Sequence, residues 1–308
     1  MNFSAEVKNE LITVKIKSPC CKRACLSGFL RSAGTIETFR GKVGFSAFAD
    51  EEILRYFCSI IKSLYGGEPE IATDKQSKRK RLRFIGDEAL SALIDCEILK
   101  TEQSGLNIII GVSKYIVEDE CCKRAFVTGA FLGSGSVTVP SFTGETKTGY
   151  HLEFVFGMYQ VAADFSDILC ALGFAPKSVE RKESFVVYFK SSEEIADVLT
   201  MIGAQKASLT LTDLIIKKGV MNNTNRALNC EMSNITKSVE ASVRIREAIA
   251  AIDSLVGLDT LPKKLRDVAL ARNNDPEASL SELADKLGIT KSCLCHRMDK
   301  IKKIAESL

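Results

Sequence analysis

Side chains suited to binding nucleic acid are concentrated near the end of the chain. Residues 261–308 contain ten Lys or Arg and seven Asp or Glu, which gives this segment a net charge of +3. All 308 residues together also have a net charge of +3, so the excess positive charge lies in this segment. Lysine and arginine pair with phosphates and guanine, and short polar groups bond to base edges. The candidate DNA-binding residues are Thr290, Lys291, Ser292, Cys295, His296, Arg297, Lys300, Lys302 and Lys303. We expect those near residue 290 to face bases, and Lys302 and Lys303 to contact phosphates.

A second basic cluster lies in the run KQSKRKRLR, residues 75–83, where we expect a hairpin. Clustered basic groups can follow a phosphate backbone, with an affinity that falls as salt rises. The candidate phosphate contacts are Lys78, Arg79, Lys80 and Arg81. The alternative is an exposed basic hairpin that binds nothing.

The eleven cysteines do not form an obvious metal site. Cys293 and Cys295 beside His296 project in different directions from a helix, and Cys20 and Cys21 with Cys25 also fall short of four ligands. An odd number of cysteines, adjacent pairs and the lack of an export signal favour reduced thiols packed as small apolar groups. We therefore expect no metal and no cofactor.

The elements that hold the C-terminal basic residues follow a helix-turn-helix pattern. Ser279 and Glu282 form a capping box that begins one helix, and Gly288 suits the left-handed turn after it. Thr290 then caps a second helix. The buried stripe of that helix is Leu294, Met298 and Ile301. The alternative is a small three-helix bundle with a solvated basic face.

The rest of the chain contains an internal repeat. CCKRA at residues 20–24 recurs at residues 121–125, and each copy leads into a small-residue pattern, CLSGFLRSAGTI or FVTGAFLGSGSV. The copies share the order helix, two strands, helix, two strands, helix. The sequence therefore predicts an α+β unit that is present twice.

The first helix of each copy has a face of small residues. These residues recur every four positions: Ala24, Gly28 and Ser32, and then Ala125, Gly129 and Gly133. A glycine inside a helix costs about 1 kcal/mol relative to alanine unless close packing requires it. We therefore expect the two helices to pack closely across a pseudo-twofold axis.

These two helices resemble the signature helices of the LAGLIDADG homing endonucleases. Gly34 and Gly135 match the last glycine of the motif, and its metal-binding aspartate falls on Ala33 and Ser134. Cleavage by this route needs carboxylates that hold divalent metal ions. Glu37 has Thr138 as its counterpart, so no symmetric acid pair replaces the missing one. We expect no nuclease activity and no catalytic residue; the alternative is a residual metal-dependent endonuclease.

The predicted architecture is a duplicated LAGLIDADG-like α+β domain with pseudo-twofold symmetry plus a small all-α helix-turn-helix domain. The duplicated domain covers residues 1–217, with repeats of about 1–113 and 114–217. A helical linker covers residues 218–260 and includes an Asn-rich patch, NNTNRALNCEMSN, that serves as a connector or contacts DNA. The helix-turn-helix domain covers residues 261–308.

This combination, together with the NR-NC stretch at residues 225–230, resembles the WhiA family over essentially the whole chain. The resemblance implies sequence-dependent binding of double-stranded DNA and a role in cell division, chromosome segregation or sporulation. Candidate protein partners are a sigma factor or another regulator. We expect a cytoplasmic, nucleoid-associated protein without a membrane segment, and not an enzyme. The alternative is a nucleoid-associated protein-interaction module.

Overall fold

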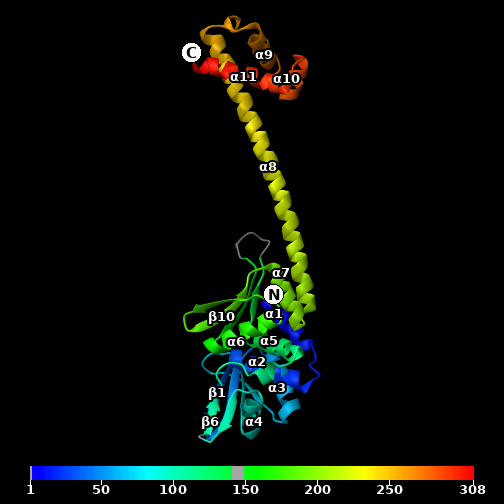
Figure 1. Cartoon of the computed structure of the whole chain (residues 1–308), viewed down its shortest axis with the longest axis vertical. Helices are drawn as coiled ribbons and strands as arrows, with labels where there is room; N and C mark the ends of the chain where they lie inside the picture. Colours follow the sequence, from blue (N-terminus) through cyan, green and yellow to red (C-terminus); the bar gives the residue numbers. More distant parts are fainter. Residues whose placement is uncertain (1, 104, 141–148) are drawn as a thin grey trace. The chain divides into compact units, whose positions relative to one another are not determined.

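The computed structural model describes residues 2–103, 105–140 and 149–308, which fall into two compact units (Figure 1). The first unit is Met1–Lys217 and the second is Lys218–Leu308. The long helix α8 (Gln205–Leu255) begins in the first unit and ends in the second. None of the helices within the described ranges is long and apolar enough to cross a membrane.

The first unit contains the predicted repeat twice. The first copy consists of α2 (Pro19–Ala33), β1 (Gly34–Phe39), β2 (Lys42–Phe48), α3 (Glu51–Tyr65), β3 (Glu70–Thr73), β4 (Lys80–Ile85) and α4 (Asp87–Asp95). The second consists of α5 (Glu120–Ser134), β7 (Ser136–Thr138), β8 (His151–Phe156), α6 (Tyr159–Ala171), β9 (Lys177–Arg181), β10 (Ser184–Phe189) and α7 (Ser192–Ile202). The strand orders, β1-β2-β4-β3 and β7-β8-β10-β9, are equivalent, so the α+β duplication is confirmed.

Each antiparallel sheet has one apolar face and one polar face, because side chains alternate along a strand. In the first sheet, Phe45 is opposite Phe84 and Ala47 is opposite Leu82, and all four are buried. In the second sheet, Leu152 and Phe154 lie opposite Phe189 and Val187 on the buried face. The helices cover these apolar faces. The other face of each sheet, the polar face, carries charged side chains together with a few apolar ones, Phe39 and Phe48 in the first sheet and Val155 and Val186 in the second.

Helices α2 and α5 pack against each other at the centre of the first unit (Figure 1). A Cβ atom on Gly28 would lie closer than 3.0 Å to the carbonyl oxygen of Phe126. A Cβ atom on Gly129 would likewise lie closer than 3.0 Å to the carbonyl oxygen of Cys25. Only glycine permits this approach from both sides. The predicted close helix pair across a pseudo-twofold axis is confirmed.

The duplication extends to individual hydrogen bonds. Ser27 Oγ donates to the carbonyl oxygen of Cys96, the C-cap of α4, at 3.0 Å. Its counterpart Thr128 lies 3.3 Å from the carbonyl oxygen of Ile202 in α7 and shares its proton with the closer carbonyl oxygen of Arg124 at 2.9 Å. Each hydroxyl thus satisfies a carbonyl at the end of its repeat's last helix.

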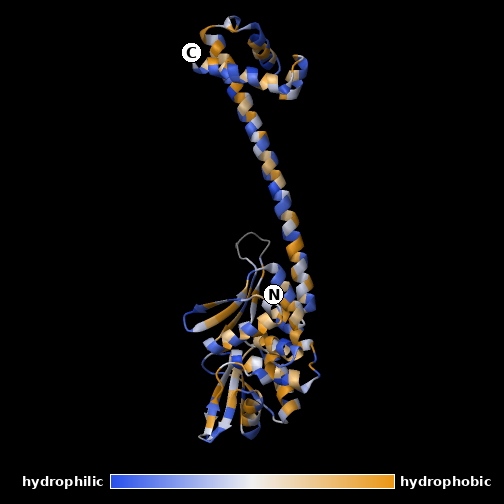
Figure 2. Cartoon of the chain, viewed as in Figure 1, coloured by the Kyte–Doolittle hydropathy of each residue, from blue (hydrophilic) through white to orange (hydrophobic). Residues whose placement is uncertain are grey.

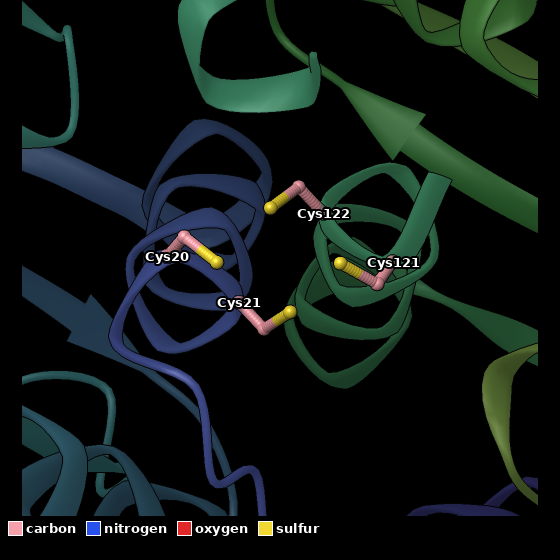
Figure 3. A group of neighbouring side chains, drawn as sticks. All are labelled: Cys20, Cys21, Cys121 and Cys122. Atoms are coloured by element: carbon pink, nitrogen blue, oxygen red, sulfur yellow. The ribbon is translucent and has the colours of Figure 1, made fainter. Parts of the chain in front are cut away.

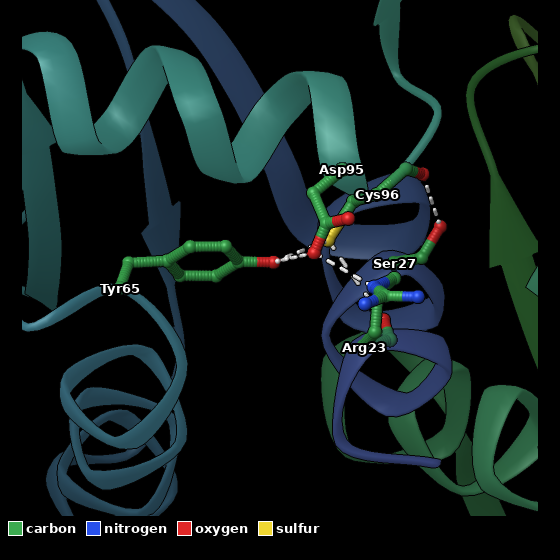
Figure 4. A network of polar contacts seen from close by, with 5 residues as sticks. All are labelled: Arg23, Ser27, Tyr65, Asp95 and Cys96. Atoms are coloured by element: carbon green, nitrogen blue, oxygen red, sulfur yellow. Dashed lines mark hydrogen bonds and ion pairs between the residues drawn. The ribbon is translucent and has the colours of Figure 1, made fainter. Parts of the chain in front are cut away.

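Around Ser27 the first repeat has an additional polar network (Figure 4). Asp95 accepts from Arg23 Nε at 2.7 Å and from the Tyr65 hydroxyl at 2.8 Å, which joins helices α2, α3 and α4. Burial raises the pKa of Tyr65, so its hydroxyl remains a donor. Arg124, the repeat counterpart of Arg23, pairs instead with Glu120 on its own helix.

Helix α1 (Phe3–Thr13) contacts both repeats, α3 of the first and β7 and α5 of the second. Ser4 Oγ donates to the carbonyl oxygen of Val137 in β7 and accepts from its N–H, both at 2.8 Å. Glu10 accepts from the N–H groups of Lys206 and Ala207 at 2.8 and 2.9 Å, and so caps the start of α8. Two further features were not predicted: the hairpin β5 (Leu99–Glu102) and β6 (Gly105–Ile108), and the short helix η1 (Lys114–Val117).

The second unit is helical. It contains the end of α8, then η2 (Leu258–Thr260), α9 (Lys263–Asn274), α10 (Leu280–Lys286) and α11 (Lys291–Glu306). Ile245, Ile249 and Ile252 of α8 are buried in its core, so this part of the predicted linker belongs to the C-terminal fold. Residues 219–241 of α8 are exposed, and they include apolar residues such as Leu228 and Met232. Figure 2 shows apolar segments alternating with polar ones along this helix.

Candidate nucleic-acid interface

Local hydrogen bonds cap the starts of α10 and α11, and a left-handed glycine lies in the turn between them. Ser279 Oγ accepts from the N–H of Glu282 at 3.2 Å, and Glu282 accepts from the N–H of Ser279 at 2.7 Å, so the predicted capping box is formed. Gly288 adopts a left-handed conformation with φ 62°. Thr290 caps α11 by accepting from the N–H of Cys293 at 3.2 Å. These caps satisfy the free N–H groups at the start of both helices.

Helix α11 presents one apolar stripe and one polar face. Leu294, Met298 and Ile301 are buried against α9 and α10, as the sequence pattern predicted. Successive helical residues are rotated by about 100°, which places four predicted residues opposite this stripe. These are Ser292, His296, Lys300 and Lys303, and all are exposed.

The other predicted residues lie at the N-cap or on the two flanks of α11. Thr290 and Lys291 are exposed at the start of the helix, and half-buried Arg297 lies on the flank away from Lys291. Cys295 and Lys302 are half-buried and line a cavity of about 390 Å³ that also involves Ser242 of α8. The structure therefore does not bring all nine candidates to one surface.

Arg272 is a buried charge that sequence inspection missed. Its side chain is 3% exposed, and its Nη1 atom donates to the carbonyl oxygens of Pro276 at 3.3 Å and Ala278 at 2.8 Å. Burial, together with the nearby charge of Arg246, lowers its pKa. Arg272 thereby fixes the loop that precedes α10. The only sequence signal is its position among the apolar residues of α9.

Acidic residues neutralise some of the positive charge in the second unit. Asp299 pairs with Lys302 at 2.7 Å, and Asp275 pairs with Lys286. Hydrogen bonds from these lysines lower the pKa of both carboxyl groups. Lys302 is consequently a weaker candidate for a phosphate contact than Lys303.

The basic hairpin consists of β3, β4 and their turn. Lys78 and Arg79 are exposed, and the guanidinium of Arg79 lies 5.5 Å from the ring centroid of Phe48. Lys80 pairs with Glu51 at 3.0 Å, and Arg81 pairs with Glu37. The four predicted phosphate contacts therefore divide into two exposed residues at the turn and two that are held in ion pairs.

On the polar face of each sheet, one glutamate is held by neighbouring basic side chains. Glu37 accepts from Arg81, from Arg83 at 3.2 Å and from Ser46 at 2.5 Å. In the second sheet, Glu153 lies 3.1 Å from His151 and 3.9 Å from Arg181. These acids offset the positive charge of both faces, and sequence reasoning did not anticipate this role.

The two positions of the missing motif acids lie at the ends of α2 and α5. Ala33 is partly buried against the core. The hydroxyl of Ser134 accepts from the N–H of Val155 at 3.1 Å. A Cβ atom on Gly133 would lie 3.2 Å from the Ala33 methyl group, so the two helix ends meet closely. Neither position offers a carboxylate for a divalent metal ion.

All eleven cysteines, each within the described ranges, are free thiols. Among the His, Cys, Asp and Glu side chains that the structure describes, one group has ligand atoms close enough to share a metal ion: Cys20, Cys21, Cys121 and Cys122. Two of these cysteines come from each repeat.

Comparison with protein families matches three consecutive parts of the chain. Residues 19–85 match the WhiA N-terminal LAGLIDADG-like domain, and residues 123–221 match the WhiA LAGLIDADG-like domain. Residues 224–305 match the WhiA C-terminal HTH domain. The last match includes the end of α8 that packs in the C-terminal core.

Relatives align with the whole chain. A protein named "Probable cell division protein WhiA" from Clostridium tetani (strain Massachusetts / E88) is 36% identical over 318 residues, covering 100% of this chain and 98% of the relative. A protein of the same name from Bacillus cytotoxicus is 34% identical over 321 residues, and the alignment covers 100% of this chain and 97% of that relative. The crystal structure of full-length DUF199/WhiA from Thermatoga maritima has a TM-score of 0.61 and 25% identity, covering 100% of this chain and 99% of that one.

The fold thus defines a class of protein in which a duplicated LAGLIDADG-like domain precedes a helix-turn-helix domain. Within that class the chain belongs to the WhiA family, because the family matches and the aligned relatives cover it from end to end.

Proposed function

We propose that this protein is a sequence-dependent DNA-binding regulator without nuclease activity, linked to cell division, chromosome segregation or sporulation. The observation that supports it most is the exposed polar face of α11, opposite the stripe that packs in the C-terminal core. A helix held this way can enter the major groove with its N-terminal residues toward base edges.

Within this proposal the α11 side chains have different tasks. Lys291 and Arg297 lie in the first half of the helix and are long enough to reach guanine. Ser292 and His296 offer shorter donors and acceptors on the central face. Lys300 and Lys303 lie further along the same face. There they can contact the phosphates that border the groove. Lys78 and Arg79 at the turn of the basic hairpin add a separate phosphate contact.

The chemistry at Ala33 and Ser134 supports the proposed absence of cleavage. A methyl group binds no cation, and the Ser134 hydroxyl already accepts a hydrogen bond from Val155. The nearby Glu37 is engaged with two arginines and Ser46. The link to cell division comes from the names of the relatives, and a sigma factor or another regulator remains a candidate partner at the nucleoid.

Selection from a random pool of DNA duplexes with the full-length chain tests the proposal. We expect the selected duplexes to share a sequence and to bind at least about 1,000-fold more tightly than a scrambled duplex at the same salt concentration. Equal affinity for both duplexes would rule out sequence-dependent binding.

A further inference from the structure

Four cysteines from two distant parts of the sequence meet at one end of the central helix pair. Cys20 and Cys21 lie in the first turn of α2, and Cys121 and Cys122 lie in the first turn of α5. Their Sγ atoms all lie within 4.8 Å of one another. Figure 3 shows the four sulfurs pointing into the space between the two helices.

We propose that Cys20, Cys21, Cys121 and Cys122 together bind one zinc ion that joins the two repeats. Zinc in structural sites takes four ligands in a tetrahedron, and four thiolates are one of its common ligand sets. This proposal replaces the expectation from sequence that the chain binds no metal. It is independent of DNA binding.

The sulfur positions fit a tetrahedral zinc site. A Zn–S bond of about 2.3 Å places the sulfurs of a tetrahedron about 3.8 Å apart. The observed limit of 4.8 Å therefore requires each pair to approach by no more than about 1 Å. A cluster of several irons with bridging sulfides would need a wider separation of the thiolates.

Packing alone does not explain all four side chains. Cys21 and Cys122 are buried, as small apolar groups are, but Cys20 is half-buried and Cys121 is exposed. The two more accessible thiols give an ion a route from solvent. In addition, Ser18 Oγ lies 3.0 Å from Cys20 Sγ, where a hydroxyl can orient a ligating sulfur.

The surroundings favour the negative charge that four thiolates around a divalent cation retain. Both cysteine pairs lie at helix N-termini, where the free N–H groups and the helix dipole stabilise negative charge. Binding of a cation to these thiols would release their protons, as at other thiolate sites.

Titration of the reduced, chelator-treated full-length chain with Co²⁺ and then with Zn²⁺ tests the site. Tetrahedral cobalt with four thiolates has intense visible and sulfur-to-metal charge-transfer absorption. We expect saturation at about one cobalt per chain and loss of the bands on addition of about one equivalent of zinc.

Two double variants and a control identify the ligands. Cys20→Ser with Cys121→Ser changes the more accessible pair, and Cys21→Ser with Cys122→Ser changes the buried pair. Each should weaken zinc binding more than about 100-fold, while Cys58→Ser with Cys170→Ser leaves it unchanged. Circular dichroism establishes that each variant is folded, and the accessible pair provides the test if the buried pair unfolds.

Three results would overturn the proposal. The first is the absence of cobalt absorption although all four thiols react with an alkylating reagent. The second is unchanged metal binding in the folded Cys20→Ser, Cys121→Ser variant. The third is a disulfide between the helices in chains alkylated at lysis, which would indicate a redox pair in place of a metal ligand set.

Discussion

The backbone of Gly129 lies so close to the carbonyl oxygen of Cys25 that a Cβ atom on it would be nearer than 3.0 Å. This contact joins α5 of the second repeat to α2 of the first, and Gly28 makes the reciprocal approach to Phe126. The atoms that would collide belong to the backbone, so no side-chain rotation can relieve the clash.

Gly129→Ala should therefore destabilise the first unit. We expect the free energy of unfolding, measured with urea, to fall by about 3 kcal/mol because the two helices must separate. Gly219→Ala is the matched control, since it lies within α8 with nothing within 4 Å of the added Cβ. That substitution should be neutral or stabilising by up to about 1 kcal/mol. Equal effects of the two substitutions would contradict the close packing.

The capping box at the start of α10 predicts a loss of stability in acid. The N–H group of Ser279 donates to the Glu282 carboxylate and lowers its pKa below the ordinary value of about 4.3. A group with a lowered folded-state pKa stabilises the fold above its unfolded pKa, and this contribution disappears as the pH falls through the folded pKa.

Glu282→Gln should retain the hydrogen bond and remove its pH dependence. Between about pH 5 and pH 3, urea unfolding of this variant should show a smaller loss of stability than the unsubstituted chain. Glu306→Gln, at the far end of α11, serves as the matched carboxyl control. An acid response of Glu282→Gln identical to that of the unsubstituted chain would argue against the role of this carboxylate.

The turn of the basic hairpin should contribute to the salt dependence of DNA binding. The double substitution Lys78→Ala with Arg79→Ala should reduce the slope of log affinity against log salt concentration by about 2. It should have little effect on sequence preference. The charge-matched control, Lys217→Ala with Lys237→Ala, removes two exposed charges of α8. If both variants keep the original slope, the hairpin does not touch DNA.

The chain should not cleave DNA in the presence of Mg²⁺ or Mn²⁺. Ala33 and Ser134 supply no carboxylates, so supercoiled plasmid should remain intact when incubated with the purified chain. A mock purification from cells that lack the chain controls for contaminating nuclease. Metal-dependent nicking that co-purifies with the chain and stops on chelation would show that another set of ligands performs cleavage.

The sequence predicted those parts of the fold that depend on local patterns. The CCKRA repeat and the spacing of Gly28 and Gly129 were sufficient for the duplicated helix pair. Likewise, Ser279 with Glu282 and the stripe beginning at Leu294 predicted the two helices of the C-terminal fold. These signals lie within one or two helical turns, where chain geometry alone determines which side chains meet.

Features that depend on long-range contacts could not be predicted in the same way. Glu37 meets Arg81 only when β1 and β4 lie in one sheet, so the charge of the hairpin was overestimated. Cys20 and Cys122 meet only because α2 and α5 pack with their first turns side by side. The CCKRA repeat together with the predicted helix pair already implied this proximity. The isoleucines of α8 recur at helical spacing from Ile245, but the sequence did not indicate which core they join.

The central claim is that α11 reads DNA sequence, and the affinity of the Lys291→Ala, Arg297→Ala variant tests it most directly. Full-length chains would be compared on a selected duplex and on its scrambled form at one salt concentration. We predict a loss of at least about 100-fold on the selected duplex, a smaller loss on the scrambled one and an unchanged circular dichroism spectrum. The Lys217→Ala, Lys237→Ala control should keep its preference for the selected duplex. An α11 variant that retains the original preference would contradict the account.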